Sequence, residues 1–253
     1  MMFALDFDGV IADSIDECLV SAHNAYSKYQ ETYDPRSGLS SFLGPQIKAF
    51  RDIRPLIRRG EDYVFIMQAM AEEKPLSTQS DFDTFLEAND HRRDVYRNIF
   101  YNERAILQQN KPKEWLALNP VYPGMPNFLK EIFATRSCVI VTTKDLDSVQ
   151  MILENQGIAA DRSDLFQATR NYRKPDIIND LIRQRDLDPK RVSFVDDHVA
   201  TVLEVAEHSK VRVCCAAWGY NTQEQLKQVV EAGLQILELN QFYNGAKAKR
   251  ILL

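Results

Sequence analysis

Short apolar runs that end in polar residues recur along this chain, and they constrain its fold more than any other feature. Three of them lie in the second half, at Ser137–Thr142, Arg191–Val195 and Val211–Trp218, and segments with helical periodicity separate them. Phe3-Ala4-Leu5 supplies another strand-like run at the start of the chain. Alternating strands and helices are typical of a parallel sheet with helices on both faces. We therefore predict an α/β fold.

About half of the chain separates the first of these runs from the next, and its pattern is helical. Apolar residues recur at three- and four-residue steps from Ile15 onward and again from Phe82. The segment 119–124, rich in proline and glycine, then disfavours a helix. The predicted architecture is a Rossmann-like parallel-sheet core that is interrupted after its first strand by an all-helical cap domain. The predicted boundaries are residues 1–15 and 119–253 for the core, and residues 16–118 for the cap.

The composition of the chain argues against several kinds of partner. Of its 253 residues, 45% are apolar, which is enough to bury a sizeable core. The formal net charge of -5 gives no broad basic field for nucleic acid. Charged Asp6 comes too early for a signal peptide, and no apolar run approaches membrane-spanning length. The cysteines lack metal-ligand spacing. We expect a cytoplasmic monomer or homodimer with no nucleic-acid or membrane partner.

Polar residues directly after strand-like runs are the first candidates for chemistry, because open α/β sheets bind ligands beyond the carboxyl ends of their strands. The first run is followed by two carboxylates, Asp6 and Asp8, and by Gly9, which permits a tight turn against a ligand. Like charges this close repel each other unless a cation lies between them. Mg²⁺ suits the position because it prefers oxygen ligands and takes only one or two protein carboxylates. A loop or helix-capping pair is the alternative interpretation.

Three further strand ends carry residues that could bind a phosphate or a metal. The hydroxyls of Thr142 and Thr143 could donate to a phosphate oxygen. Lys174, at the expected start of a helix, could neutralise both the phosphate and an aspartate. Asp196 and Asp197 end the next strand, and whichever does not cap the following helix could bind a metal. Each has an ordinary interpretation on its own, since threonines end many strands and most lysines are solvated.

In this order, the four strand ends resemble the motifs of the haloacid dehalogenase-like superfamily, and in particular its phosphoglycolate phosphatase-like branch with an inserted helical cap. The resemblance implies that Asp6 is the nucleophile and Asp8 the general acid/base. It implies that Thr142 and Lys174 bind the phosphate and that Lys174 assists catalysis. It also implies that Mg²⁺ is bound by Asp6, the backbone carbonyl of Asp8, and Asp197, although the sequence leaves open whether Asp196 or Asp197 is the main ligand.

The activity implied by this resemblance is Mg²⁺-dependent hydrolysis of a small phosphorylated metabolite through a phospho-aspartyl intermediate. Asp8 argues against a dehalogenase, because cleavage of a carbon–halogen bond needs no protonated alkoxide. A sugar-phosphate mutase stays as an alternative, although those enzymes commonly carry a histidine where this chain has Cys18. A non-catalytic phosphate-binding protein is the other alternative. One departure is Thr201, where many relatives carry an acid, and Asp196 could substitute for that acid.

The predicted cap is where substrate selection would occur. Arg51, Arg54 and Arg58 recur at three- and four-residue steps, so one helical face could meet a carboxylate or second phosphate of the substrate. A solvated arginine face is the more ordinary interpretation. The aromatic residues of the region are expected to form the cap core: Phe82, Phe85, Tyr96 and Phe100.

Overall fold

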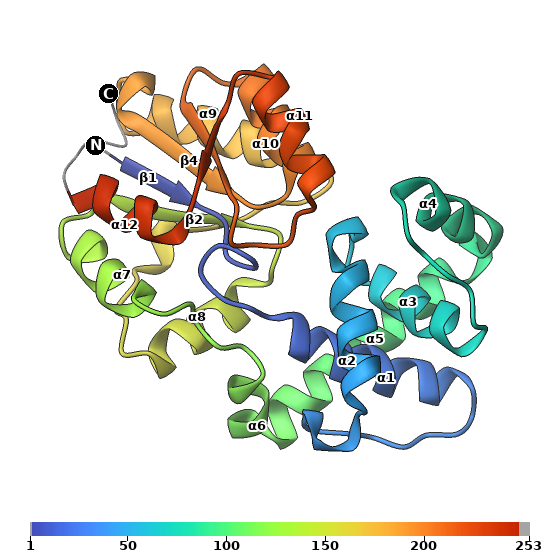
Figure 1. The fold of residues 1–253 in the computed structure, drawn as a ribbon. Helices are drawn as coiled ribbons and strands as arrows, with labels where there is room; N and C mark the ends of the chain where they lie inside the picture. The colour runs from blue at the N-terminus through green and yellow to red at the C-terminus, as the bar shows by residue number, and fades with distance from the viewer. Residues whose placement is uncertain (1, 248–253) are drawn as a thin grey trace. The chain divides into compact units, whose positions relative to one another are not determined.

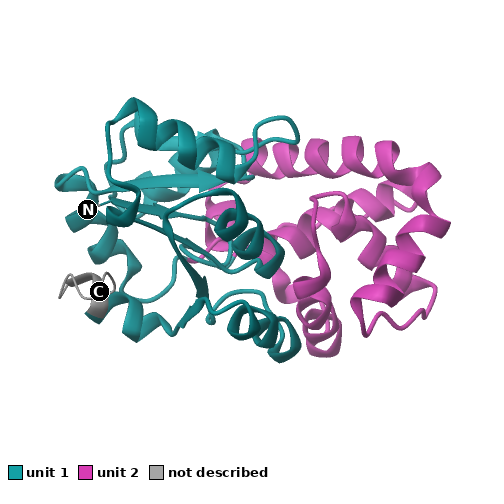
Figure 2. Cartoon of the chain, turned by 90° about the horizontal axis from the view of Figure 1, so that it is seen from above, with its two compact units in different colours: residues 1–13, 121–253 teal, residues 14–120 magenta. Residues whose placement is uncertain are grey.

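A parallel sheet organises one of the two compact units in the computed structural model, which describes residues 2–247. Unit 1 comprises residues 1–13 and 121–253, and unit 2 comprises residues 14–120 (Figure 2). Unit 2 therefore lies in the sequence between the first and second strands of the sheet. None of the helices within the described residues is both long enough and apolar enough to cross a membrane.

The sheet of unit 1 has six strands in the order β3-β2-β1-β4-β5-β6, and every neighbouring pair is parallel (Figure 1). The strand order reverses at β1, so the carboxyl ends of β1, β2 and β4 meet at one edge, where open α/β sheets bind their ligands. The predicted Rossmann-like α/β core is confirmed. The strands are β1 (Met2–Leu5), β2 (Cys138–Thr142), β3 (Leu165–Gln167), β4 (Val192–Asp196), β5 (Arg212–Ala216) and β6 (Gln235–Leu237).

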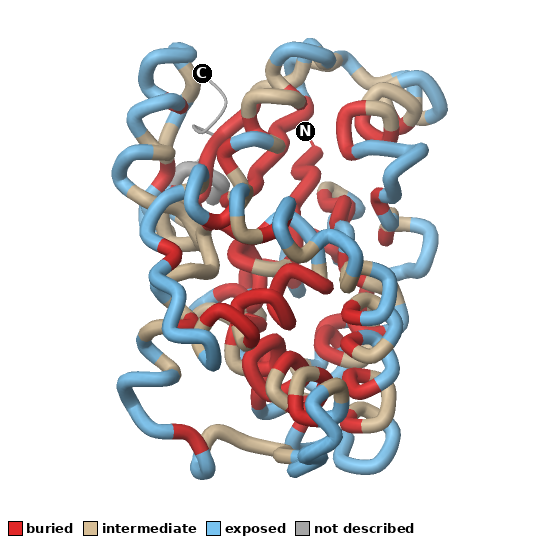
Figure 3. The backbone as a smooth tube through the Cα atoms, turned by 90° about the vertical axis from the view of Figure 1, so that its right-hand side faces the viewer, coloured by how far each residue is buried: buried red, intermediate tan, exposed pale blue. Residues whose placement is uncertain are grey.

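The central strands are almost wholly apolar because both faces of the sheet are covered. Every residue of β1, β2 and β4 is buried, and buried segments are red in Figure 3. Phe3 of β1 pairs in register with Cys138 of β2 on one side and with Ser193 of β4 on the other. The edge strands β3 and β6 are shorter and partly exposed.

Helices pack on both faces of this sheet. On one face, Val202 of α10 shares an apolar cluster with Phe194 of β4. On the other face, the ring of Phe3 lies 6.0 Å from the rings of Phe128 of α7 and Phe242 of α12. The α-helices of unit 1 are α7 (Met125–Ala134), α8 (Leu146–Asn155), α9 (Lys174–Gln184), α10 (Val199–His208), α11 (Gln223–Glu231) and α12 (Leu239–Lys247), with 3-10 turns η4 (Arg162–Asp164) and η5 (Pro189–Arg191).

Unit 2, residues 14–120, contains helices and turns but no strand. Its core is aromatic: the buried ring of Tyr96 lies 4.9 Å from that of Tyr29 and 4.8 Å from that of Phe65. Phe82 and Phe100 are also fully buried, whereas Phe85 is only partly so. The helices are α1 (Ile15–Tyr29), α2 (Gly44–Ile53), α3 (Asp62–Ala71), α4 (Gln79–Ala88), α5 (Arg93–Asn110) and α6 (Pro112–Ala117), with 3-10 turns η1 (Leu39–Ser41), η2 (Arg54–Leu56) and η3 (Asp90–Arg92).

The prediction that three arginines of this unit share one helical face is wrong. Helix α2 contains Arg51 but ends before Arg54, which starts the 3-10 turn η2. Pro55 explains the end of the helix, since proline has no N–H to continue the hydrogen-bond ladder. Arg58 lies beyond that turn. Arg51 is in addition paired within the unit, with its Nη2 2.8 Å from Oδ1 of Asp16.

Candidate active site

Asp6 follows β1 directly and prolongs its pairing with β4. Its backbone N–H donates to the carbonyl of Val195 at 2.9 Å, and the residue is buried. The chain then makes a tight turn, in which the N–H groups of Ile11 and Ala12 donate to the carbonyl of Phe7 at 2.8 and 3.0 Å. These bonds fix the loop that carries the two carboxylates of the first predicted motif.

Gly9 is required in this loop for two reasons. Its φ of +85° is strained for residues with a side chain, and a Cβ there would lie 2.2 Å from Oδ2 of Asp197. Gly219, after β5, adjoins the same carboxylate, because a Cβ there would lie 2.2 Å from the Cβ of Asp197 and 2.6 Å from the carbonyl oxygen of Gly9. The two glycines therefore make the space in which the Asp197 side chain is held.

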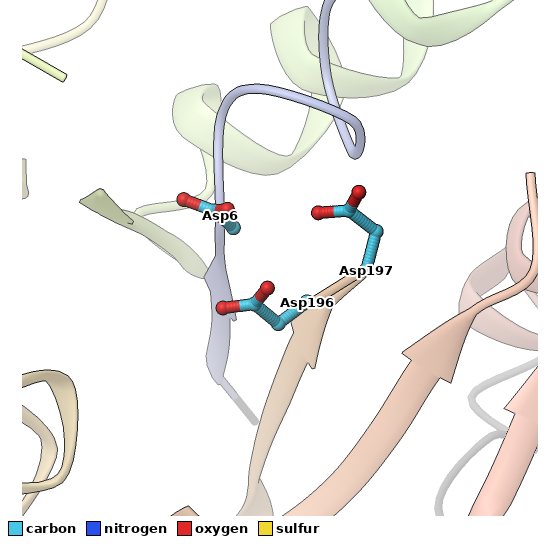
Figure 4. A group of neighbouring side chains, drawn as sticks. All are labelled: Asp6, Asp196 and Asp197. Atoms are coloured by element: carbon cyan, nitrogen blue, oxygen red, sulfur yellow. The ribbon is translucent and has the colours of Figure 1, made fainter. Parts of the chain in front are cut away.

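Three carboxylates gather at the edge where β1 and β4 end. Asp6, Asp196 and Asp197 each offer one oxygen, and these oxygens lie within 4.8 Å of one another (Figure 4). All three residues are buried, Asp196 completely. The ammonium of Lys174 is beside them, so three negative charges face one positive charge there. Buried carboxylates this close are costly unless a cation binds between them, so the donor set fits a divalent metal.

Lys174 is the first residue of α9, and its ammonium lies between two of these carboxylates. Its Nζ is 2.8 Å from Oδ1 of Asp6 and 2.8 Å from Oδ2 of Asp196. Burial by itself would lower the pKa of Lys174, but the charges of Asp196 and Asp6 outweigh it and raise the pKa above its usual value. The ammonium is therefore permanently charged at neutral pH.

The carboxyl group of Asp6 has a raised pKa. Burial raises its pKa to about 7, the charge of Lys174 opposes this shift, and the charge of Asp196 adds to it. Oδ1 of Asp6 is buried and accepts no hydrogen bond of good geometry from the described residues, although Nζ of Lys174 is close enough for an ion pair. An oxygen in this condition is suited to a metal ion, which would favour the ionised form.

Asp196 and Asp197 have different partners, and neither caps the helix that follows. Asp196 uses both oxygens, accepting the backbone N–H of His198 with Oδ1 and the ammonium of Lys174 with Oδ2. Asp197 accepts the backbone N–H of Tyr220 with Oδ2 at 2.6 Å. The N-cap of α10 is His198, whose side chain makes no capping bond. Both oxygens of Asp196 are therefore occupied, one by Lys174 and one by the backbone of the loop that leads into α10.

The second predicted motif divides into a buried and an exposed residue. Thr142 ends β2 and is fully buried, and its Oγ1 accepts the backbone N–H of Lys144 at 3.1 Å. Thr143 is exposed, and its side chain makes no hydrogen bond to any other candidate residue within the described chain. The geometry therefore favours Thr142 over Thr143 as a phosphate ligand.

The side chain of Asp8 lies outside the three-carboxylate group. It is 24% exposed, and its Oδ1 is 3.2 Å from Nζ of Lys144, whose side chain is 1% exposed. Lys144 was not among the residues predicted to act in the site. The pairing joins residues 136 positions apart, so nothing in the local sequence indicates it.

The loop after β5 also contributes to the site, although its sequence resembled the family without predicting a role for any of its residues. The indole N–H of Trp218 donates to the carbonyl of Val10 at 3.1 Å, and the hydroxyl of Tyr220 donates to Oδ1 of Asp13 at 2.7 Å. The side-chain amide of Asn221 donates to the carbonyl of Ala216 at 2.8 Å. The sequence feature that could have indicated this role is Gly219, which lies between two aromatic residues shortly after a strand. This loop fixes both the loop after β1 and the carboxylate of Asp197.

Together, the fold and the site define a class: an α/β protein whose buried carboxylates and lysine gather at the point where the order of its parallel strands reverses, which is where open α/β sheets bind ligands. The model of the haloacid dehalogenase-like hydrolase family matches residues 3–216, which include every candidate from Asp6 to Asp197. The chain belongs to this family of hydrolases. The predicted resemblance is confirmed at this level.

Solved structures with the same fold lie at low sequence identity. A proposed phosphoglycolate phosphatase from Lactobacillus delbrueckii subsp. bulgaricus has a TM-score of 0.65 and 17% identity, over 97% of each chain. A predicted phosphoglycolate phosphatase from Haemophilus somnus has a TM-score of 0.56 and 17% sequence identity, over 88% of this chain and 87% of the other. A hydrolase of this family from Deinococcus radiodurans, with bound phosphate and sodium, has a TM-score of 0.55 and 14% sequence identity, over 100% of this chain and 96% of the other. These likenesses establish the fold alone. A search of curated protein sequences finds no significant match.

Proposed function

We propose that this protein is a Mg²⁺-dependent phosphatase that hydrolyses a small phosphomonoester through a phospho-aspartyl intermediate on Asp6. The observation that carries the proposal is the buried Asp6 carboxylate, which lies beside Lys174, Asp196 and Asp197 at the carboxyl end of the central strand. Membership in a hydrolase family supports it, as do relatives named for the hydrolysis of a phosphate ester.

In the first step of this mechanism, a carboxylate oxygen of Asp6 attacks the phosphorus in line with the ester oxygen. The bond between phosphorus and the ester oxygen breaks, and the leaving oxygen takes a proton from the carboxyl group of Asp8. In the second step, Asp8 takes a proton from water while the water oxygen bonds to phosphorus. The bond to Asp6 breaks, inorganic phosphate leaves, and both aspartates return to their starting states.

Charge stabilisation supplies most of the catalysis in phosphoryl transfer. Lys174 would neutralise the phosphoryl oxygens and keep Asp6 oriented, and the buried hydroxyl of Thr142 would donate to one of those oxygens. A bound Mg²⁺ would add positive charge at the same oxygens. Asp6, Asp197 and the backbone carbonyl of Asp8 would hold it.

We assign Asp197, rather than its neighbour, as the main metal ligand from the fourth motif. Both oxygens of Asp196 are engaged, one by Lys174 and one by the backbone N–H of His198. Binding a metal through Asp196 would therefore weaken the position of Lys174. The carboxylate of Asp197 is instead oriented by a backbone group, the N–H of Tyr220.

We further propose that residues 16–118 form the cap that selects the substrate. The support is structural: the regular secondary structure of this region is entirely helical, and the region falls within unit 2, residues 14–120. Caps in such enzymes exclude water until a substrate fits. The pairing of Arg51 with Asp16 within the unit weakens the case for Arg51 as a substrate ligand.

The proposal is tested by phosphate release from a panel of small phosphomonoesters, with and without Mg²⁺. The wild-type protein should release phosphate only with Mg²⁺, and Asp6→Asn should fall to background because its amide cannot form the intermediate. Asp147→Asn is the matched control, since this exposed aspartate of α8 lies in the same unit. Equal activity of Asp6→Asn and the wild type would refute the proposal. Conversion of a sugar phosphate to its isomer without net phosphate release would indicate the mutase instead.

A further inference from the structure

Lys144 is a buried lysine whose ammonium faces the carboxylate of Asp8. Its side chain is 1% exposed, and its Nζ lies 3.2 Å from Oδ1 of Asp8. A buried ammonium is costly unless an anion is beside it. Its partner is the group to which the proposed function assigns both proton transfers. The inference that follows therefore rests on that proposed function.

The position of Lys144 is fixed by the turn that follows β2. Its backbone N–H donates to Oγ1 of Thr142 at 3.1 Å. The next residue, Asp145, is the N-cap of α8 and accepts the backbone N–H of Ser148 at 2.8 Å. A hydroxyl that accepts an N–H still has its own proton to donate, so Thr142 keeps its capacity to donate to phosphate. One residue thus orients Thr142 with its backbone and Asp8 with its side chain.

The chemistry of the ammonium distinguishes the two oxygens of Asp8. Lysine has three donors and no acceptor, so an oxygen that accepts from it cannot present a proton to it. Oδ1 of Asp8 faces Nζ of Lys144, so in the acid form of Asp8 the proton would be on Oδ2. We propose that Lys144 is a positioning residue that occupies Oδ1 of Asp8 and so commits Oδ2 to proton transfer.

This assignment applies to both chemical steps. In the first, Oδ2 of Asp8 gives its proton to the oxygen of the leaving alcohol as the phosphorus–oxygen bond breaks. In the second, Oδ2 takes a proton from the water whose oxygen bonds to phosphorus. Lys144 keeps its own protons throughout and contacts the same oxygen, Oδ1, in both states. Loss of Lys144 would let the carboxyl group rotate and place its proton on either oxygen.

The test uses the dependence of the rate on the leaving group. An alkyl phosphate needs a proton on its leaving oxygen, whereas p-nitrophenyl phosphate does not, because p-nitrophenolate is a weak base. Lys144→Met keeps the length of the side chain and removes the donor. The rate of the burst phase reports formation of the phospho-enzyme. Lys144→Met should lower this rate about 100-fold with the alkyl phosphate, which is in the range typical of general acid catalysis. It should lower the rate less than about 10-fold with p-nitrophenyl phosphate.

Two further variants separate positioning from structure. Lys144→Arg keeps a donor-only cation and should retain the wild-type ratio of the two burst rates, whatever its absolute rate. In an Asp8→Asn background, Lys144→Met should cause no additional loss with the alkyl phosphate, because the group that it positions is gone. Lys190→Met, at an exposed lysine of the same unit, is the control and should change neither rate.

Three results would overturn the inference. Equal losses for the two esters in Lys144→Met would mean that Lys144 stabilises the phosphate or the fold. Multiplied losses in the double variant would mean that it acts independently of Asp8. A ratio for Lys144→Arg as altered as that for Lys144→Met would mean that the donor is irrelevant. If the wild type hydrolyses neither ester, the proposed function fails and this inference with it. If Asp6→Asn abolishes both hydrolyses while Lys144→Met leaves the ratio unchanged, only this inference fails.

Discussion

Replacing Gly219 with alanine should displace the carboxylate of Asp197 while leaving every residue assigned to the chemistry unsubstituted. The φ of Gly219 is not in the left-handed region, so the substitution causes no backbone strain. The new Cβ would lie 2.2 Å from the Cβ of Asp197, whereas ordinary contact begins at 3.4 Å, so the two must separate by 1.2 Å (3.4 − 2.2). The Tyr220 N–H that Asp197 accepts belongs to the residue after Gly219, so the movement disturbs the support of the carboxylate as well.

A displacement of about 1 Å in a catalytic site can cost about 100-fold in rate, and overpacking costs about 1–3 kcal/mol of stability. We expect Gly219→Ala to lower kcat/KM about 100-fold and to raise the Mg²⁺ concentration that gives half-maximal activity. The free energy of unfolding, measured with urea, should fall by about 1–3 kcal/mol. Phosphate release across a Mg²⁺ titration measures the first two effects.

Gly233→Ala is a matched control for this experiment. Gly233 has a φ of +70°, and no atom lies within 4 Å of the position that an alanine methyl group would take, so its substitution brings strain and no clash. It should cost about 1–2 kcal/mol of stability and leave the Mg²⁺ dependence unchanged. A folded Gly219→Ala protein with the wild-type rate and Mg²⁺ dependence would refute the role assigned to Asp197 and the loop after β5.

Two other outcomes follow from the buried charges and thiols. Lys174→Met should abolish phosphate release and lower the free energy of unfolding by about 3–5 kcal/mol, because it leaves the carboxylates of Asp6 and Asp196 without their cation. Urea denaturation measures this loss, and an unchanged midpoint would contradict it. Burial raises the pKa of Cys214 to about 11 and of Cys215 to about 12, so at pH 8 both are protonated and unreactive. A colorimetric thiol reagent should therefore react with both thiols much more slowly in the native protein than in the unfolded protein, and the slow native reaction should become faster as the pH rises. Rapid labelling of both thiols in the native protein at pH 8 would contradict their buried placement.

The strands that the sequence predicted are those whose apolar runs are continuous. The runs at 137–142 and 211–218 contain β2 and β5, and the run at 191–195 covers all of β4 except Asp196, because strands covered on both faces are rich in apolar residues. The edge strands β3 and β6 were not predicted. Each has only three residues, and solvent reaches part of each, so neither leaves a recognisable apolar run.

The arginines of unit 2 were predicted to share a helix that the structure does not contain. Their periodic spacing was interpreted without the proline that ends the helix. Arg51 and Arg54 have helical spacing, but Pro55 ends the helix between them. The pairing of Arg51 with Asp16 joins two helices of the unit and was not visible in local spacing. Periodic spacing of side chains indicates one face of a helix only over residues whose backbone can remain helical.

The sequence by itself determined which residues end the central strands, and therefore which carboxylates, hydroxyl and lysine are candidates for chemistry. The apolar character and the periodicity of a segment are local properties, so they can be inferred from neighbouring residues. Only the tertiary structure decided the partners: Asp196 with Lys174, Asp197 with the N–H of Tyr220, and Asp8 with Lys144. Parallel strands bring distant segments to one edge of the sheet, and which charges meet there depends on strand order and backbone geometry that no local pattern contains.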